Sequence, residues 1–218
     1  MVLLRAFQVN WESPLFSRLS YAVYSRMNQG IHQSYPASYL EIEVATNNSG
    51  FTMASEPLTG SLLRTLAASK PKGKFLELGT GTGLSTSWIL DGMDAESTLT
   101  TVDFDDKFLK IAKQFLGHDA RLSLELSDGE QWILKNKDLR FEYIFADTWH
   151  GKYLLLNETL DMLNPGAFYI VDDMLTQPNW PDGHAEKAEA FVEQLERRQD
   201  LHITKQSWAT GIIIAVKK

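Results

Sequence analysis

Three carboxylates stand where short apolar runs end in the second half of the chain. Asp147 ends the predicted strand Phe141–Asp147, and Asp172 and Asp173 close the predicted strand Ala167–Asp172. Open α/β sheets bind their ligands beyond the carboxyl ends of the strands, so we expect these acids to share a site. Converging carboxylates need a cation to offset their repulsion, and oxygen ligands suit Mg²⁺ or Ca²⁺. The sequence therefore predicts a divalent-cation site, Mg²⁺ before Ca²⁺; the alternative is that Asp172 and Asp173 only cap a loop.

A glycine-rich turn could hold a nucleoside-type cofactor. Gly79, Gly81 and Gly83 follow a β-rich run and precede a predicted helix, so the backbone can turn tightly and the helix N-terminus offers free N–H groups. Asp103 ends the next predicted strand, where a carboxylate can accept hydrogen bonds from ribose hydroxyls. Leu84 stands where a dinucleotide-binding turn has its third glycine, which disfavours a nicotinamide dehydrogenase.

The elements that must position these residues alternate along the chain from Lys74 onward. Such alternation, with continuous apolar strands, is typical of a mainly parallel sheet covered by helices on both faces. Two further β-runs, Leu201–Ser207 and Gly211–Val216, predict a C-terminal hairpin that adds an antiparallel strand. The predicted strands are Lys74–Leu78, Thr98–Asp103, Leu122–Leu126, Phe141–Asp147 and Ala167–Asp172, and the predicted helices include Asp105–Leu116, Lys152–Leu163 and Ala185–Arg198.

Size, charge and composition exclude several classes of function. The 218 residues suffice for a single domain, with residues 1–50 expected as a helical and loop cap over the site and residues 51–218 as the core. A net charge of −7 argues against a broad nucleic-acid-binding face, so no DNA partner is expected. The chain has no Cys, which excludes disulfides and Cys-ligated metals. With no signal-peptide pattern and no apolar run of the ~20 residues that a membrane span needs, we expect a soluble, cytoplasmic protein.

The motifs resemble those of a known enzyme family. Residues Glu77–Gly83, together with Asp103, resemble the motifs of class I S-adenosylmethionine (SAM)-dependent methyltransferases. Residues Phe145–Tyr153, followed by Tyr169–Met174, are similar to the catechol O-methyltransferase and caffeoyl-CoA O-methyltransferase group. The resemblance covers residues 53–218 in order and spacing. It implies a Rossmann-like methyltransferase fold, with a seven-stranded, mostly parallel sheet, and SAM as the cofactor.

The resemblance implies how the cofactor is held. In that family the glycine-rich turn wraps the methionine part of SAM, the acid that corresponds to Asp103 binds the ribose, and the residue at Phe104 flanks the adenine. Asp128 is implied at the adenine amine, and it could equally cap the helix that follows it. Trp149 is expected to stack on the adenine, to wall the substrate pocket or to pack in the core. The other cofactor-binding residues that the resemblance implies are Met53, Ser55, Gly60, Glu77, Gly79, Thr80, Gly81, Gly83, Ser85 and Asp147.

The resemblance also implies the catalytic machinery, with two departures from the family pattern. The family's metal site has two aspartates and an asparagine, whereas Asp173 takes the place of the asparagine beside Asp147 and Asp172. The family's catalytic lysine, three residues after the first metal aspartate, is replaced by His150, whose imidazole can accept a proton at neutral pH. Lys152 is the competing base, and a third alternative is that the metal alone activates the substrate.

Together these features predict a SAM-dependent O-methyltransferase. The expected acceptor is a small phenolic or vicinal dihydroxy compound, and a divalent cation and a His base are expected to assist the transfer. The alternatives are a metal-independent methyltransferase that modifies a nitrogen or RNA, and a SAM-binding module without activity. Residues 202–208 contain no acid where the catechol enzyme has a glutamate, which argues against catechol itself. A homodimer is expected from the family alone.

Overall fold

The computed structural model describes residues 34–177 and 180–218. Within them, Tyr35–Lys218 belong to one compact unit. The cap expected over residues 1–50 falls mostly on residues 1–33, which lie outside the described part. From residue 34 onward, helix α2 (Tyr39–Ser49) packs beside α5 (Asp106–Leu116) and α4 (Leu84–Gly92). Among the described residues, no helix has the length and apolar character needed to cross a membrane.

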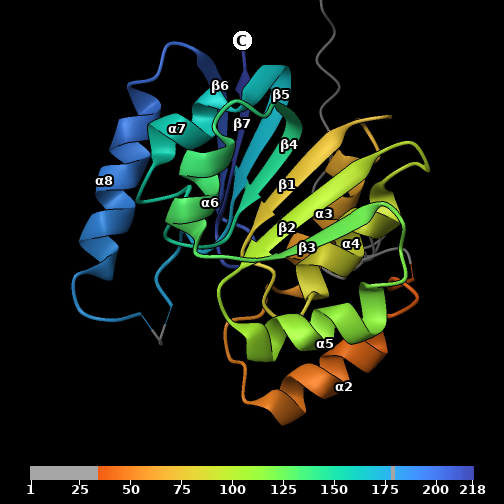
Figure 1. The fold of residues 1–218 in the computed structure, drawn as a ribbon. Coiled ribbons are helices and arrows are strands. Elements are labelled where there is room, and N and C mark those ends of the chain that lie inside the picture. Colours follow the sequence, from red (N-terminus) through yellow and green to blue (C-terminus); the bar gives the residue numbers. More distant parts are fainter. Residues whose placement is uncertain (1–33, 178–179) are drawn as a thin grey trace, which may run out of the picture. The chain divides into compact units, whose positions relative to one another are not determined.

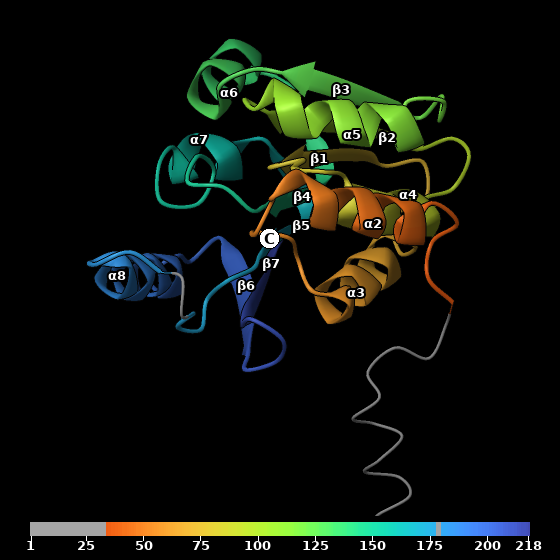
Figure 2. The ribbon, with the colours of Figure 1, turned by 90° about the horizontal axis from the view of Figure 1, so that it is seen from below.

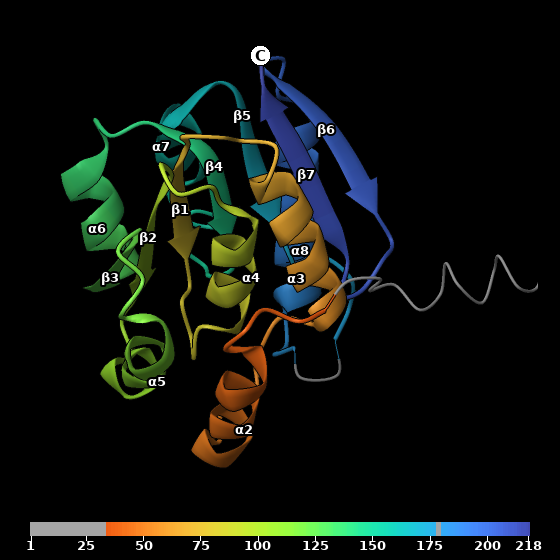
Figure 3. The same ribbon diagram turned by 90° about the vertical axis from the view of Figure 1, so that its right-hand side faces the viewer.

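A seven-stranded sheet is the centre of the fold, with the strand order β3-β2-β1-β4-β5-β7-β6. The first five strands are parallel, and β7 runs antiparallel to both β5 and β6 (Figure 3). The prediction of a mostly parallel sheet with a C-terminal hairpin is therefore confirmed. The strands are β1 (Lys74–Leu78), β2 (Thr98–Asp103), β3 (Leu122–Leu126), β4 (Phe141–Ala146), β5 (Leu163–Val171), β6 (Leu201–Gln206) and β7 (Ile212–Lys217).

Helices cover both faces of the sheet (Figures 1 and 2). On one face lie α6 (Gly129–Asn136), α7 (Leu156–Asp161) and α8 (His184–Glu196), and on the other lie α3 (Pro57–Ala67), α4 (Leu84–Gly92) and α5 (Asp106–Leu116). Because successive side chains of a strand point to opposite faces, Leu76 packs toward the first layer while Phe75 lies on the other face. Both are fully buried, which is why the central strands are almost continuously apolar.

The segment after β4 differs from the sequence prediction. We expected a helix over Lys152–Leu163, whereas α7 spans only Leu156–Asp161. Leu155 has a left-handed backbone with φ of 56°, so the helix cannot extend back through it. Instead the preceding residues form a loop, in which the Gly151 N–H donates to the Leu154 carbonyl at 2.7 Å. The prediction was wrong there because apolar residues at helical spacing also arise in a loop that packs on the core.

Gly60 has a packing role inside α3. A Cβ on this residue would overlap the indole ring of Trp88 in α4, which is itself 1% exposed. The absence of a side chain therefore lets α3 and α4 approach each other closely. Gly60 does not line the cavity described below.

Replacing Gly60 with Ala tests this close approach. In an ordinary helix interior, replacing Gly with Ala raises the free energy of unfolding by about 1 kcal/mol. Forcing an extra methyl group against a packed side chain such as Trp88 lowers it by about 1–3 kcal/mol. We expect Gly60→Ala to lower the free energy of unfolding in urea. Ser61→Ala, at the next position of the same helix, serves as the control and should be neutral or stabilising. A Gly60→Ala protein as stable as the wild type would contradict the account.

Candidate active site

A cavity of 590 Å³ lies at the carboxyl ends of the central strands. Its wall consists of the segments that follow β1, β2, β3 and β4, together with residues 51 and 53–55 before α3. Strand β1 pairs with β2 on one side and with β4 on the other. The chain therefore winds in opposite directions from β1, and such a switch point is where open α/β sheets bind ligands.

The glycine-rich turn after β1 forms one wall of the cavity. Gly79 has φ of 107° and Gly81 has φ of 51°, both in the region that favours glycine. A Cβ on Gly79 would lie 2.7 Å from the side chain of Thr148, and one on Gly81 would lie 2.8 Å from the ring of Phe51. Both glycines are needed for the shape of the turn and for the approach of its neighbours, as the sequence predicted.

Asp103 joins the ends of β1 and β2 beside this turn. Its Oδ2 accepts a hydrogen bond from the Gly81 N–H at 2.7 Å, and its Oδ1 accepts one from the Asp105 N–H at 2.9 Å. Asp103 also lines the cavity, next to Phe104, whose side chain is 76% exposed. Each carboxylate oxygen has a second lone pair, so Asp103 can still accept hydrogen bonds from a ligand.

The structure brings together most of the residues predicted to bind a cofactor. Glu77 and Gly83 do not line the cavity: Glu77 is fully buried in the sheet, and Gly83 packs against Ala112. Trp149 is 44% exposed, so core packing does not explain it. The predicted residues that do line the cavity are Met53, Ser55, Gly79, Thr80, Gly81, Ser85, Asp103, Phe104, Asp128, Asp147 and Trp149.

The three aspartates of the predicted cation site have different surroundings. Asp147 lines the cavity, and its Oδ2 accepts a hydrogen bond from the Ser55 hydroxyl at 3.1 Å. Asp172 is 2% exposed, and its Oδ1 accepts hydrogen bonds from the Thr210 hydroxyl and from the Asp173 N–H. Asp172 and Asp173 do not line the cavity. Burial, reinforced by the other two carboxylates, raises the pKa of Asp147 well above its ordinary range.

The chain itself places a cation beside these acids. Lys152 is 5% exposed, and its Nζ donates to the Asp172 carbonyl at 2.6 Å. Burial lowers the pKa of Lys152, while the charges of Asp147, Asp173 and Asp172 oppose that shift. Lys152 therefore offsets part of the repulsion between the carboxylates, which the sequence prediction had assigned to a metal ion alone. Among the described residues, the ligand atoms of the three aspartates do not form a group within 4.8 Å of one another. Their oxygens are nevertheless of the type that Mg²⁺ binds, through one or two carboxylates and several waters.

His150 and Lys152, the two predicted bases, lie in different places. His150 lines the cavity, whereas the buried Lys152 does not. The His150 ring lies against Gly129: a Cβ on that glycine would be 3.0 Å from Nδ1. Asp128 caps α6, because its Oδ1 accepts the Gln131 N–H at 3.1 Å, and it lines the cavity as well. Capping and a role at the cavity therefore coexist at Asp128.

Residues 76–174 match the family described as "Methyltransferase domain". The match covers a little under half of the chain. The match begins in β1 and includes the glycine-rich turn, Asp103 and the acids Asp147, Asp172 and Asp173. The predicted resemblance to class I methyltransferases is therefore confirmed.

Relatives and solved structures extend this result. A Mycobacterium leprae protein named "Putative O-methyltransferase" is 31% identical over 98 residues, 43% of this chain and 44% of the relative. An O-methyltransferase of Bacillus cereus, solved with S-adenosylhomocysteine (SAH), has a TM-score of 0.76 and 18% identity over 90% of this chain and 97% of that one. A Staphylococcus aureus protein described as a "putative caffeoyl-CoA O-methyltransferase" has a TM-score of 0.71 and 17% identity, over 93% of this chain and 100% of that one. The chain spans about half the length of the curated relatives it matches.

The cavity is also lined by apolar residues to which the sequence assigned no role. Phe51 and Phe108 face each other with ring centroids 4.7 Å apart, and Leu154 is 47% exposed. No motif marks them, because apolar residues in loops and helices are ordinarily core. Only their positions in the sequence could have indicated that they line the cavity: Phe51 lies two residues before Met53, and Leu154 lies four residues after His150.

Glu77 is the most unusual buried group in the domain. Its Oε2 accepts hydrogen bonds from the hydroxyls of Thr86 at 2.5 Å and Thr101 at 2.6 Å. Among the described residues, Oε1 has no hydrogen-bond partner. Burial raises the pKa of Glu77 to about 7, although the two hydroxyls favour the charged form. Glu77 therefore fixes the end of β1 under the glycine-rich turn rather than contacting the cavity.

The raised pKa predicts how stability depends on pH. Glu77 has a pKa of about 7 in the folded protein, against an ordinary value of 4.5. Between these pH values the folded state binds more protons than the unfolded state. The free energy of unfolding therefore falls as the pH rises from 4.5 to 7. The total loss is on the order of 3 kcal/mol. The measurement is the difference in the free energy of unfolding in urea between pH 5 and pH 8. Glu77→Gln is neutral at both pH values and should lose the part of this difference that Glu77 causes, whereas Glu189→Gln, at an exposed position, should keep it. An unchanged slope in Glu77→Gln would rule out the assignment.

Proposed function

We propose that the chain is a SAM-dependent methyltransferase that transfers a methyl group to a hydroxyl oxygen of a small acceptor. The observation that carries the proposal is the hydrogen bond from the Gly81 N–H to Asp103 at the cavity wall. It joins the turn that would follow the methionine part of the cofactor to the acid that would hold the ribose. The Bacillus cereus structure with SAH supports the choice of cofactor by fold.

The residues of the cavity suit an adenosyl ligand. Asp103 can accept hydrogen bonds from the two ribose hydroxyls, and the exposed ring of Phe104 offers a flat apolar surface to the adenine. Asp128 lies at the far end of the same wall, after β3, where its free lone pairs can accept a hydrogen bond from the adenine amine. The predicted roles of all three are compatible with one ligand.

Exposed apolar residues that line the cavity favour an apolar, flat acceptor. Met53, Trp149 and Leu154 are 66%, 44% and 47% exposed. Large exposed apolar side chains are costly to hydrate unless a ligand covers them. Asp147 lines the same cavity and supplies a polar group that an acceptor hydroxyl needs. A phenolic ring that carries one or two hydroxyls meets both requirements.

Methyl transfer is a single displacement at carbon. The acceptor oxygen forms a bond to the methyl carbon, the carbon–sulfur bond breaks, and its electron pair converts the sulfonium to the thioether of SAH. The chain must align the oxygen, carbon and sulfur, and must accept the hydroxyl proton. The candidate bases for that proton are Lys152, which lies beside Asp147 and Asp172, and His150, which lines the cavity near Asp128. A divalent cation held by Asp147, Asp172 and Asp173 would polarise the acceptor hydroxyl when bound.

Asp103→Asn tests the cofactor site. Hydrogen bonds to a charged acceptor contribute about 1.5–3 kcal/mol, so the loss of charge should weaken SAH binding about ten- to a hundredfold in calorimetry. Asp106→Asn, an exposed acid in the first turn of α5, is the matched control and should bind SAH as the wild type does. Equal SAH affinity in the Asp103→Asn and wild-type proteins would refute the ribose assignment.

Lys152 favours a second candidate, methyl transfer without a metal. A buried ammonium beside Asp147 and Asp172 can lower the repulsion that a cation would otherwise have to offset. Such an enzyme could act on phenols or, as the sequence also allowed, on a nitrogen or RNA. SAH binding with no transfer to any phenol, amine or RNA would leave a SAM-binding module without activity.

Removal of divalent cations separates the two candidates. With a panel of mono- and dihydroxyphenols and radiolabelled SAM, we expect EDTA to lower single-turnover transfer roughly a hundredfold and Mg²⁺ to restore it. Asp147→Ala should lose Mg²⁺ binding in calorimetry. Full transfer in EDTA would favour the metal-independent candidate that uses Lys152 instead.

The same assay reports on the base. If His150 accepts the proton, His150→Gln should slow single-turnover transfer across pH 6–9, and its pH dependence should flatten. Full transfer by His150→Gln over this range would leave Lys152 or the cation as the activating group.

A further inference from the structure

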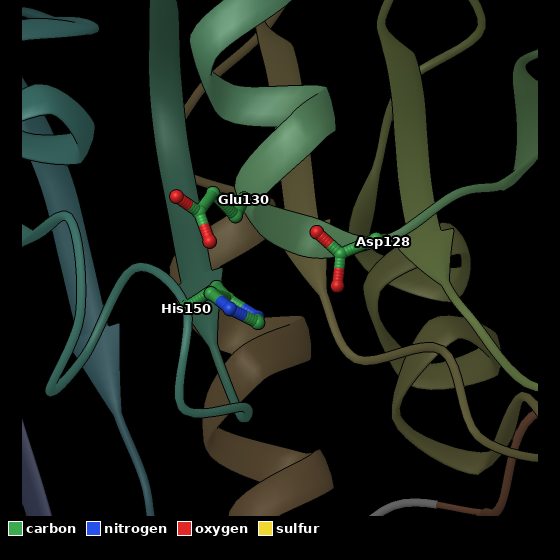
Figure 4. A group of neighbouring side chains, drawn as sticks. All are labelled: Asp128, Glu130 and His150. Carbon is green, nitrogen blue, oxygen red and sulfur yellow. The ribbon is translucent and has the colours of Figure 1, made fainter.

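Three potential metal ligands converge beside the cavity, apart from the acids already described. Ligand atoms of Asp128, Glu130 and His150 all lie within 4.8 Å of one another. Figure 4 shows the two carboxylates and the imidazole grouped around one space, with the acids at the start of α6 and the histidine on the loop after β4. Two segments that are distant in the sequence therefore supply the group.

The His150 ring is held in position by its neighbours. Gly129 packs against it so closely that a Cβ there would be 2.9 Å from the His150 Cβ and 3.0 Å from Nδ1. The backbone bridge between His150 and Leu154 fixes the loop on its other side. Among the described residues, neither the ring nitrogens of His150 nor the carboxylate of Glu130 has a hydrogen-bond or ion-pair partner within the chain. An oriented imidazole with free nitrogens beside two carboxylates is a donor set for a metal ion.

The types of donor indicate which metal. An imidazole nitrogen with two carboxylates suits Zn²⁺ and the neighbouring divalent ions Co²⁺, Ni²⁺ and Mn²⁺, whereas Mg²⁺ prefers oxygen alone. The acids Asp147, Asp172 and Asp173 offer only oxygen and are not part of this group. The positive end of the α6 dipole opposes a cation here, so the affinity is expected to be lower than that of a structural metal site.

We propose that Asp128, Glu130 and His150 form a transition-metal site whose occupation blocks the cofactor cavity. Asp128 and His150 line that cavity, and Glu130 does not. An ion held by all three draws Asp128 and His150 together across the adenine end and withdraws Asp128 from a ligand. The metal site stands on the side chains alone, whereas the competition with SAM rests on the proposed function. Zn²⁺ is then an inhibitor of this enzyme that acts separately from an activating Mg²⁺.

Glu130→Gln is the decisive variant, because it removes one ligand without altering the cavity wall. Zn²⁺ is titrated calorimetrically into the metal-stripped wild type, Glu130→Gln and Glu186→Gln. Glu186 is an exposed acid in the first turn of α8 and provides the matched control. Because changes even outside the ligand shell weaken metal binding about ten- to a hundredfold, the loss of a ligand should weaken Zn²⁺ binding at least about tenfold. No Zn²⁺ binding by the wild type, or equal binding by Glu130→Gln, overturns the site.

SAH titrations then test the competition. If binding is exclusive, Zn²⁺ at ten times its Kd raises the apparent Kd of SAH about elevenfold in the wild type. Glu130→Gln should bind SAH like the wild type without Zn²⁺ and should show little change with it, and Mg²⁺ at the same concentration should have no effect on either. An SAH affinity independent of Zn²⁺ overturns the competition. A failure of SAH to bind any of these proteins refutes the proposed function instead and leaves the Zn²⁺ result to stand.

Discussion

The hydrogen bond from the Gly81 N–H to Asp103 is the contact on which the cavity depends. The bond joins the ends of two adjacent parallel strands, β1 and β2, at 2.7 Å. The glycine-rich turn must bring its backbone to that carboxylate, and its positive φ angles exclude most other residues. Under the turn, the buried Glu77 holds Thr86 and Thr101 and so fixes the start of α4 against β2. The wall of the cavity is therefore set by the backbone and by two acids with distinct roles.

Charge is arranged around the cavity in two separate groups. The first group consists of Asp147, Asp172 and Asp173, with the buried Lys152 beside them. The lysine offsets part of the repulsion between the carboxylates, so a metal ion would bind in addition to a cation that the chain already supplies. Asp128, Glu130 and His150 lie at the other end, at the start of α6. The two groups differ in chemistry, because only the second contains an imidazole. Different metal ions are therefore expected to have opposite effects on one domain.

Much of the fold could be predicted from the sequence, because the strands are short apolar runs between clear helical stripes. The glycine-rich turn and Asp103 could be placed because backbone geometry restricts the residue types there. The loop 148–155 could not, since Tyr153 and Leu156 have helical spacing while Leu155 adopts a left-handed backbone. The place of Lys152 was also beyond the sequence, because burial beside Asp172 depends on the return of β5 next to β4. Spacing alone predicts which residues meet at strand ends and not which of them face the cavity.

The central claim is that the cavity at the ends of β1, β2 and β4 holds an adenosyl cofactor. A crystal structure of the protein grown with SAH tests it most directly. We expect density for the ribose hydroxyls within hydrogen-bond distance of Asp103, with the adenine beside Phe104 and Asp128. SAH bound elsewhere, or an empty cavity at saturating SAH, would contradict it.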